Sequence, residues 1–364
     1  MLDARKQLET VIADQMRNNN IREAFPPCLE NLTESDFTDR TASDRQDFRS
    51  LRVFTIDGQG CQDHDDAISV TCTEDGTIIG VHIADVSCFV EQGTALDQEA
   101  LDRGSSIYFP DRTIPMLPKI LTDDLCSLVA GKDRKTLSIL IRVDMDCNVI
   151  DYSITKGLIR SRVKGVYSEV NHRILSGKAD RATREKYDCV LEDIRLLEHI
   201  SDVLLQRRIA AGAVIQGNSE PDILIREDEI CLVPQRRGKA ERMIEELMIL
   251  ANRLVVEFMI RNRLPCLYRI QSQGERMAEY RAVVNRHYSL ALDAYCHATS
   301  PIRRYSDIVV HRIISAFLAQ DDALVQRTAA WLEKNDQEIC VWITRRSRRA
   351  KNVMHGVITG SDVI

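Results

Sequence analysis

The 364-residue sequence contains no pair of cysteines spaced as CxxC, although 11 cysteines lie between Cys28 and Cys340. An odd number of cysteines without paired spacing is typical of free thiols in a reducing compartment. A disulfide framework or a zinc site would require a more regular spacing. The cysteine pattern therefore favours a cytoplasmic protein.

Long apolar runs and linkers are also missing. No uncharged apolar run is long enough to span a bilayer, and the early residues Asp3, Glu9 and Asp14 are unlike a secretory signal or a transit peptide. No stretch rich in Gly, Ser or Pro divides the chain, and 44% of its residues are hydrophobic. We therefore expect a soluble globular protein with one core and no membrane partner.

An excess of positive charge is absent as well, because the formal net charge is −6. Proteins that bind nucleic acids are usually basic, but binding depends on where the charges lie. Bound cations can also offset clustered carboxylates. The net charge therefore does not exclude a nucleic-acid partner.

Four aspartates lie within ten residues in the segment FTIDGQGCQDHDDAISV, namely Asp57, Asp63, Asp65 and Asp66. The flanking β-branched runs indicate strands, so the carboxylates should converge beside the start of a sheet. Carboxylate oxygens are hard ligands that suit Mg²⁺ or Mn²⁺, and two such ions can clamp the attacking and the leaving oxygen of a phosphodiester. The cluster predicts metal-assisted phosphoryl hydrolysis.

Two other interpretations of this cluster are open, and a third fails. A solvated acidic turn is the commonest form of an arbitrary acidic run. An EF-hand loop needs oxygen ligands at alternate positions and then a glycine, and the presence of Gln59 and Cys61 breaks that pattern. The pair His64-Asp65 is compatible with a helical metal-dependent phosphohydrolase, although the flanking strand-like runs argue against it.

Hydrophobic periodicity predicts an α+β fold. Strand-like runs occur at 53–56, 78–86, 137–143 and 158–163, whereas helical periodicity dominates the second half. One helix is expected at 191–210, ending before the favourable cap Gly212. A second helix should begin near Glu241, and its buried stripe consists of Met243, Leu247, Leu250, Leu254 and Phe258.

The segment SPIRRYSD predicts the start of another helix. Ser300 and Pro301 form a good N-cap and first-turn pair, and apolar residues follow at helical spacing. The free N–H groups and the positive end of such a helix attract phosphate, and Arg303 and Arg304 would add charge in the same turn. Paired arginines are often only a solvated surface, but behind an aspartate cluster we expect a phosphate contact.

The motifs that follow the aspartates resemble, in order, the catalytic domain of the ribonuclease II and ribonuclease R family. They are VHIADVSCFV, GTALDQEALDRGSSIYFPDRTIPMLP, LTDDLCSL and AYCHATSPIRRYSDIVVHRI, and the resemblance runs from about Arg22 to about Ala350. It implies a single RNB-type catalytic domain with a mixed sheet surrounded by helices. The implied divisions are a leader and approach segment at 1–50, the catalytic domain at 51–355 and a short tail at 356–364.

The implied activity is hydrolysis of single-stranded RNA from its 3′ end, releasing nucleoside 5′-monophosphates by a two-metal mechanism with Mg²⁺. Asp57 and Asp66 resemble direct metal ligands, Asp63 resembles a supporting ligand, and Asp65 resembles the residue most critical for the chemical step. The resemblance assigns Arg303 to the scissile phosphate, where it would stabilise developing charge.

The resemblance also implies contacts with RNA. Tyr108 and Tyr167 would stack on bases, Glu245 would contact a ribose hydroxyl and so help to distinguish RNA from DNA, and Arg304 would be structural or a backbone contact. Taken alone, the tyrosines would more often be core residues and Glu245 an exposed helix residue.

The sequence departs from the family pattern in three ways. Gln216 stands where a clamping aromatic residue is usual. Lys351 stands where a glutamate is usual, and it extends a basic cluster formed by Arg345, Arg346, Arg348 and Arg349. The small RNA-binding β-barrels that usually flank the catalytic domain are not expected here, so a separate RNA-binding protein is a candidate partner. The alternative function is a weak or inactive RNA-binding or regulatory protein.

Overall fold

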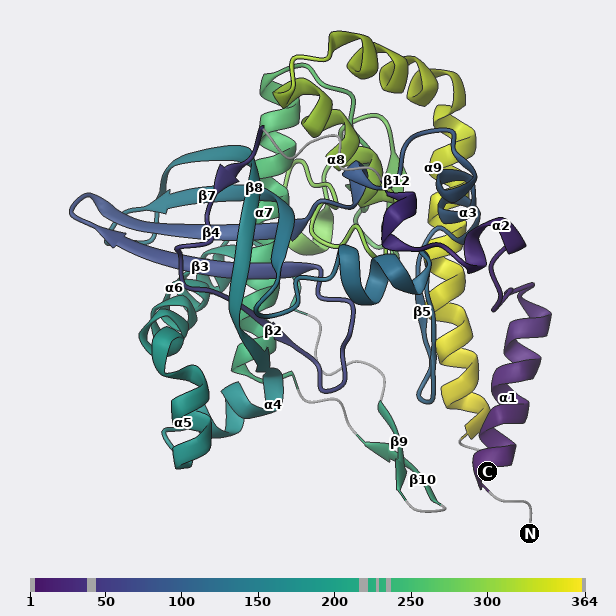
Figure 1. The fold of residues 1–364 in the computed structure, drawn as a ribbon, viewed down its shortest axis with the longest axis horizontal. Helices are drawn as coiled ribbons and strands as arrows, with labels where there is room; N and C mark the ends of the chain where they lie inside the picture. Colours follow the sequence, from purple (N-terminus) through teal and green to yellow (C-terminus); the bar gives the residue numbers. More distant parts are fainter. Residues whose placement is uncertain (1–3, 38–43, 216–221, 227–228, 234–236, 362–364) are drawn as a thin grey trace.

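A mixed sheet of six strands forms one side of the fold, at the left in Figure 1. The structure is a computed structural model that describes residues 4–37, 44–215, 222–226, 229–233 and 237–361. The strands, in their spatial order, are β1 (Gln46–Asp47), β8 (Val149–Val166), β2 (Val53–Asp57), β3 (Asp66–Thr73), β4 (Gly76–Ala84) and β7 (Asp133–Val143). β8 runs parallel to β1 and β2, and the other pairs are antiparallel. β8 pairs with β7 as well as with β2, so the strands β8, β2, β3, β4 and β7 form a closed ring of neighbours.

Helices surround this sheet, as the predicted α+β class requires (Figure 1). They are α1 (Ala4–Asn18), α2 (Pro27–Glu30), α3 (Ala95–Arg103), α4 (Tyr167–Glu169), α5 (Arg181–Tyr187), α6 (Leu191–Ala210), α7 (Lys239–Arg261), α8 (Tyr305–Leu318) and α9 (Asp322–Ser361). Three two-stranded hairpins are β5 (Ile107–Tyr108) with β6 (Thr113–Ile114), β9 (Asp222–Arg226) with β10 (Glu229–Val233), and β11 (Tyr268–Ile270) with β12 (Glu279–Arg281). Within the described residues, no helix combines the length and the apolar character needed to cross a bilayer.

The elements predicted from periodicity are present, with different ends for some strands. Helix α6 spans the predicted residues, and the residue after its cap, Gly212, has a φ of +93°, the left-handed conformation that ends helices. The predicted stripe of α7 is buried. The strand expected at 78–86 instead ends at Ala84, and β8 is much longer than predicted because it has partners along both edges.

The predicted helix start at Ser300 and Pro301 is wrong. Helix α8 begins at Tyr305, and the segment before it forms turns. The N–H groups that such a helix start would offer to phosphate are already used, because Ser300 N–H donates to Asp307 and Ile302 N–H donates to Asp65. A phosphate at this position would therefore have to contact side chains.

The main core lies between the sheet and the helices, and a smaller core joins the two ends of the described chain. Leu8 and Ile12 of α1 pack with Val353 and Val357 of α9, and the two helices lie side by side in Figure 1. None of the cysteines that the structure describes is joined in a disulfide.

A buried histidine lies in the sheet and makes the fold sensitive to acid. His82 on β4 is fully buried, and its ring nitrogens form hydrogen bonds with Ser69 (2.9 Å) and Ser138 (2.8 Å). Gly80 leaves room for this arrangement, since a Cβ there would lie 2.6 Å from the His82 ring. Burial lowers the pKa of His82 from 6.5 to about 3. The ring is therefore neutral in the folded protein at neutral pH.

We expect the free energy of unfolding to decrease as the pH is lowered, because of His82. The folded-state pKa lies below the ordinary value, so the unfolded chain binds more protons in acid. The stabilisation is complete above pH 6.5 and is lost as the pH falls towards 3. Between pH 6.5 and about pH 5, His82 should account for roughly 2 kcal/mol of unfolding free energy. Urea unfolding of wild type and His82→Gln should show a shallower pH dependence in the variant. An equal dependence would contradict the prediction, and the exposed His199→Gln is the matched control.

Candidate active site

The sheet register brings the predicted carboxylates to one edge. β2 ends at Asp57 and β3 begins at Asp66, and the antiparallel pairs Val53 with Ser69 and Phe54 with Ile68 set the end of one strand beside the start of the other. The intervening loop, 58–65, contains Asp63 and Asp65 and is not helical, which excludes the helical phosphohydrolase alternative for His64-Asp65.

Asp57 lies close enough to Asp66 to influence the protonation of Asp66. Burial, and then the negative charge of Asp57, raise the pKa of Asp66 to about 7. Two carboxylates that are pressed together and partly shielded from water favour a shared proton or a cation. The all-oxygen donor set of the four aspartates suits a hard cation such as Mg²⁺.

Asp65 joins the aspartate loop to the segment that precedes α8. Its side chain is buried, and Oδ1 accepts a hydrogen bond from Ile302 N–H at 2.8 Å. Oδ2 lies 3.4 Å from Arg303 Nε and has no hydrogen-bond partner. Burial raises the pKa of Asp65 well above its ordinary value, while Arg303 opposes that shift. Asp65 is thus a buried carboxylate with one unsatisfied oxygen that faces the arginine.

The two neighbouring arginines have different environments. The Arg303 side chain is 44% exposed and donates one hydrogen bond, to Ser300 Oγ at 3.0 Å. Arg304 forms a bidentate ion pair with Asp307, which is fully buried (2.7 Å and 3.0 Å). This pairing favours the structural alternative for Arg304 and leaves Arg303 as the arginine that can reach a ligand.

The two predicted base-stacking tyrosines lie beside the aspartates. Tyr108 on β5 is 39% exposed, and its hydroxyl donates to Asp63 Oδ2. Tyr167 begins α4 directly after β8, and the parallel pair Asp57 with Val166 places it at the same sheet edge. Burial, followed by Asp66 and Asp57, raises the pKa of Tyr167. Both rings are therefore positioned around the carboxylates.

Glu245 lies on α7 and does not contact the aspartates. Both of its carboxylate oxygens accept from Arg237 at 3.1 Å, and its side chain is 42% exposed. Glu241, one turn earlier on the same helix, accepts a hydrogen bond from Asn171 and influences Tyr167. Helix α7 therefore connects the position of Glu245 to the tyrosine side of the site.

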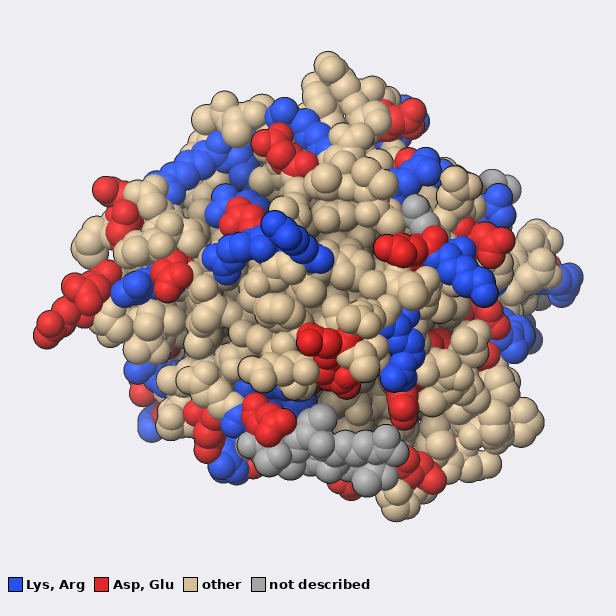
Figure 2. Space-filling model, turned by 90° about the horizontal axis from the view of Figure 1, so that it is seen from above, with Lys and Arg blue, Asp and Glu red and all other residues tan. Residues whose placement is uncertain are grey.

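The basic cluster on α9 is partly packed against the protein. Arg346 lies over the Trp342 ring at 4.0 Å, and Arg349 donates to the Asn19 carbonyl. Burial lowers the pKa of Arg349 to about 10. Lys351 is exposed, and Gln216 lies outside the described residues. On the face shown in Figure 2, basic and acidic side chains are interspersed, without a broad field of one sign.

The comparisons with known proteins agree with this geometry. A family model described as the RNB domain matches residues 45–281 and 275–320, which include the aspartate loop and the segment before α8. The chain belongs to the RNB domain family. Ribonuclease R of Thermotoga maritima is 34% identical over 84% of this chain and 51% of that protein. This RNB chain thus spans about half the length of the curated relatives that it matches.

Solved structures share the RNB fold. Mycoplasma genitalium RNase R, solved in complex with ribose methylated single-stranded RNA, has a TM-score of 0.86 and 23% identity, covering 96% of this chain and 63% of that one. Yeast Ssd1, described as a pseudonuclease, has a TM-score of 0.70 and 18% identity, covering 96% of this chain and 50% of that one. RNB folds thus occur in proteins described as nucleases and in one described as a pseudonuclease.

Two residues at the site of this RNB chain were not predicted to act there. His64 is buried, and its Nδ1 donates to Asp57 Oδ2 at 2.6 Å. The thiol of Cys61 faces Asp57 Oδ1 at 4.0 Å and Asp63 Oδ1 at 3.4 Å. Burial, then Asp57 and Asp63, raise the pKa of Cys61, which makes its sulfur a poor nucleophile. Their spacing from Asp57, at four and seven residues, was the available signal.

Proposed function

We propose that this chain is a hydrolytic 3′-to-5′ exoribonuclease that degrades single-stranded RNA to nucleoside 5′-monophosphates, with Mg²⁺ as cofactor and Mn²⁺ as a substitute. The observation that carries the proposal is the placement of four aspartates in one loop and at the strand ends that flank it, with Arg303 beside Asp65. Family membership supports the same reaction class. An RNA substrate is supported by the RNA named with the M. genitalium neighbour.

The residues present divide the work of such a reaction. Asp57, Asp63, Asp65 and Asp66 would hold the cations, which when bound polarise a phosphodiester and activate water. Arg303 would bind a non-bridging phosphate oxygen and stabilise the charge that develops during displacement. Asp65 would orient Arg303, because its unsatisfied Oδ2 faces the guanidinium.

The tyrosines would position the RNA. Tyr108 is partly exposed, so its ring would stack on a base while its hydroxyl remains bonded to Asp63. Tyr167 would contact the RNA from another side of the aspartate cluster, beside Asp57 and Asp66. Stacking accepts any base, which suits degradation without sequence preference.

A direct assay tests the proposal. The full chain should shorten 5′-labelled single-stranded RNA stepwise from its 3′ end in Mg²⁺ and release nucleoside 5′-monophosphates. A chelator should stop the reaction, and added Mg²⁺ or Mn²⁺ should restore it. A ladder from the 5′ end, internal cleavage or activity that is unaffected by chelation would each contradict the proposal.

The second candidate function is an inactive RNA-binding or regulatory protein, favoured by the likeness to the pseudonuclease Ssd1. All four aspartates and Arg303 are present here, whereas a degenerate nuclease is expected to have lost at least one of them. RNA binding without any Mg²⁺-dependent product in the assay above would favour this second function.

We expect Glu245 to contribute to the choice of RNA over DNA. A carboxylate that accepts from a 2′-hydroxyl favours ribose, and Glu245 would exchange its exposed Arg237 partner for that group. Glu245→Ala should narrow the ratio of RNA to DNA degradation rates by on the order of tenfold. The matched control is Glu257→Ala, an exposed glutamate on the same helix that also faces an arginine. Equal ratios of RNA to DNA degradation rates in wild type and Glu245→Ala would show that Glu245 does not select ribose.

A further inference from the structure

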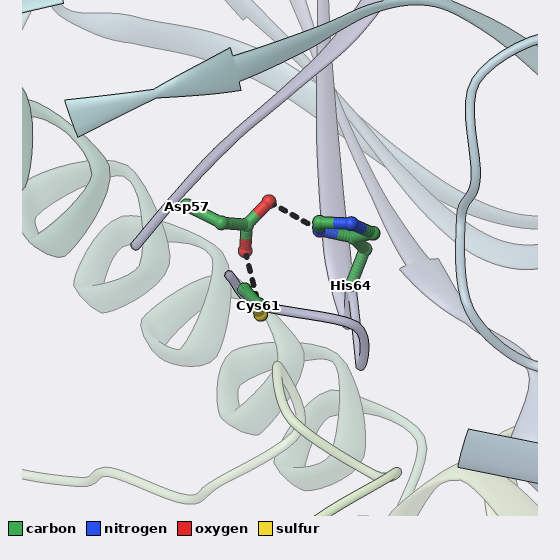
Figure 3. A group of neighbouring side chains, drawn as sticks. All are labelled: Asp57, Cys61 and His64. Atoms are coloured by element: carbon green, nitrogen blue, oxygen red, sulfur yellow. Dashed lines mark hydrogen bonds and ion pairs between the residues drawn. The ribbon is translucent and has the colours of Figure 1, made fainter. Parts of the chain in front are cut away.

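Three different donor groups surround one point in the loop between β2 and β3. The side chains of Asp57, Cys61 and His64 place a carboxylate oxygen, a thiol sulfur and an imidazole nitrogen all within 4.8 Å of one another. Figure 3 shows the Asp57 carboxylate between the other two, with one oxygen directed to His64 and the other to Cys61. His64 is 2% exposed, and Asp57 and Cys61 are half-buried.

This donor set differs in kind from the four aspartates. Mg²⁺ takes oxygen ligands and has little affinity for sulfur, whereas Zn²⁺ is bound by Cys, His and Asp together. Cys61 and His64 therefore contribute nothing to a magnesium site as ligands. With Asp57 they supply three of the four ligands of a tetrahedral site.

The three donor atoms lie near enough to one another for a single ion to reach them all. Tetrahedral coordination at ordinary zinc distances separates oxygen from nitrogen by about 3.3 Å and oxygen from sulfur by about 3.5 Å. The observed separations are 2.6 Å between His64 Nδ1 and Asp57 Oδ2, and 4.0 Å between Cys61 Sγ and Asp57 Oδ1. These two distances involve different oxygens of Asp57, so the carboxylate would have to turn to present one oxygen to an ion that both His64 and Cys61 also bind.

We propose that Asp57, Cys61 and His64 bind a borderline-soft divalent cation, Zn²⁺ above all, and that this site shares Asp57 with the magnesium site. Because one carboxylate cannot serve both geometries fully, zinc and magnesium should compete. Zinc would then inhibit hydrolysis, a consequence that rests on the proposed nuclease function. The binding of zinc itself does not depend on that function.

Cobalt titration of the full chain without RNA tests the site, because Co²⁺ takes zinc geometry and absorbs light. Wild type should show tetrahedral Co²⁺ absorption with a thiolate-to-cobalt charge-transfer band, and Zn²⁺ should abolish both. Cys61→Ser should lose the charge-transfer band, and both Cys61→Ser and His64→Gln should weaken Co²⁺ binding on the order of tenfold or more. Cys72→Ser, an exposed cysteine on β3, is the matched control and should retain the wild-type spectrum.

The outcomes separate this proposal from the nuclease function. Absence of tetrahedral Co²⁺ absorption in folded wild type, or an unchanged band in Cys61→Ser, would overturn the zinc site whether or not the chain degrades RNA. Mg²⁺ should lower the apparent Co²⁺ affinity if Asp57 is shared, and an affinity independent of Mg²⁺ would overturn the sharing. Loss of the spectrum in Cys61→Ser with no nuclease activity in any variant would refute the proposed function alone.

Discussion

Asp65→Asn should reduce RNA hydrolysis on the order of a thousandfold or more while RNA binding remains close to wild type. Asparagine keeps an oxygen that can accept from Ile302 N–H, so the connection between the loop and the segment before α8 can persist. The second oxygen, which faces Arg303 Nε at 3.4 Å, is replaced by an amide group without charge. The change therefore removes both a carboxylate from the metal cluster and the electrostatic anchor of Arg303.

Single-turnover hydrolysis and RNA affinity should be measured separately for this variant. Affinity is compared with a chelator present, so that wild type does not consume the RNA. Asp75→Asn, in the exposed turn between β3 and β4, changes the same chemical group away from the site and should behave as wild type. Turnover in Asp65→Asn within a few-fold of wild type would remove Asp65 from the mechanism, and an equal loss of RNA affinity would mean that it acts in binding.

The sequence predicted those parts of the fold in which local pattern and tertiary environment agree. Helix α6 ends where Gly212 can adopt a positive φ, and the α7 stripe is buried because its spacing matches the helical repeat. The length of β8 could not be predicted in this way. β8 pairs with the neighbouring strand β7 along one edge and with β1 and β2, about 100 positions earlier in the chain, along the other. Periodicity carries no information about such distant partners.

The error at Ser300 has a similar origin. A serine followed by a proline has the local chemistry of a helix start, but the tertiary structure uses that backbone for other contacts. Asp307 accepts from the Ser300 N–H, and Asp65, more than 200 residues earlier in the chain, accepts from the Ile302 N–H. The segment before α8 therefore forms turns, and Arg303 in these turns lies beside Asp65 of the aspartate loop.

At the candidate site, the location of the aspartates could be predicted from the sequence. The side chains that contact them could not. The four aspartates lie along one sheet edge because strands on both sides fix their loop. The spacing rule for zinc sites considers pairs of cysteines or histidines, so the mixed set of Asp57, Cys61 and His64 escaped it. Only the folded loop reveals that the three donor groups face one another.

Substitution by lysine should impair hydrolysis at Arg303 and stability at Arg304. Arg303→Lys keeps a positive charge but loses the planar fork that can bind a phosphate through two hydrogen bonds. Since Arg303 is 44% exposed and makes a single side-chain hydrogen bond, the folded state should lose little stability. Hydrolysis should fall on the order of a hundredfold, mostly in the chemical step.

Arg304→Lys should instead destabilise the protein. Asp307 is fully buried, and Arg304 binds both of its carboxylate oxygens, whereas a lysine cannot reproduce that bidentate geometry. The free energy of unfolding should fall by about 2 kcal/mol, since at least one hydrogen bond to the buried carboxylate is lost. Urea denaturation and single-turnover hydrolysis, applied to both variants well below their unfolding midpoints, distinguish the roles. If Arg304→Lys kept its stability but lost RNA affinity, the arginine would be an RNA contact, and the ion pair with Asp307 would not be its principal role.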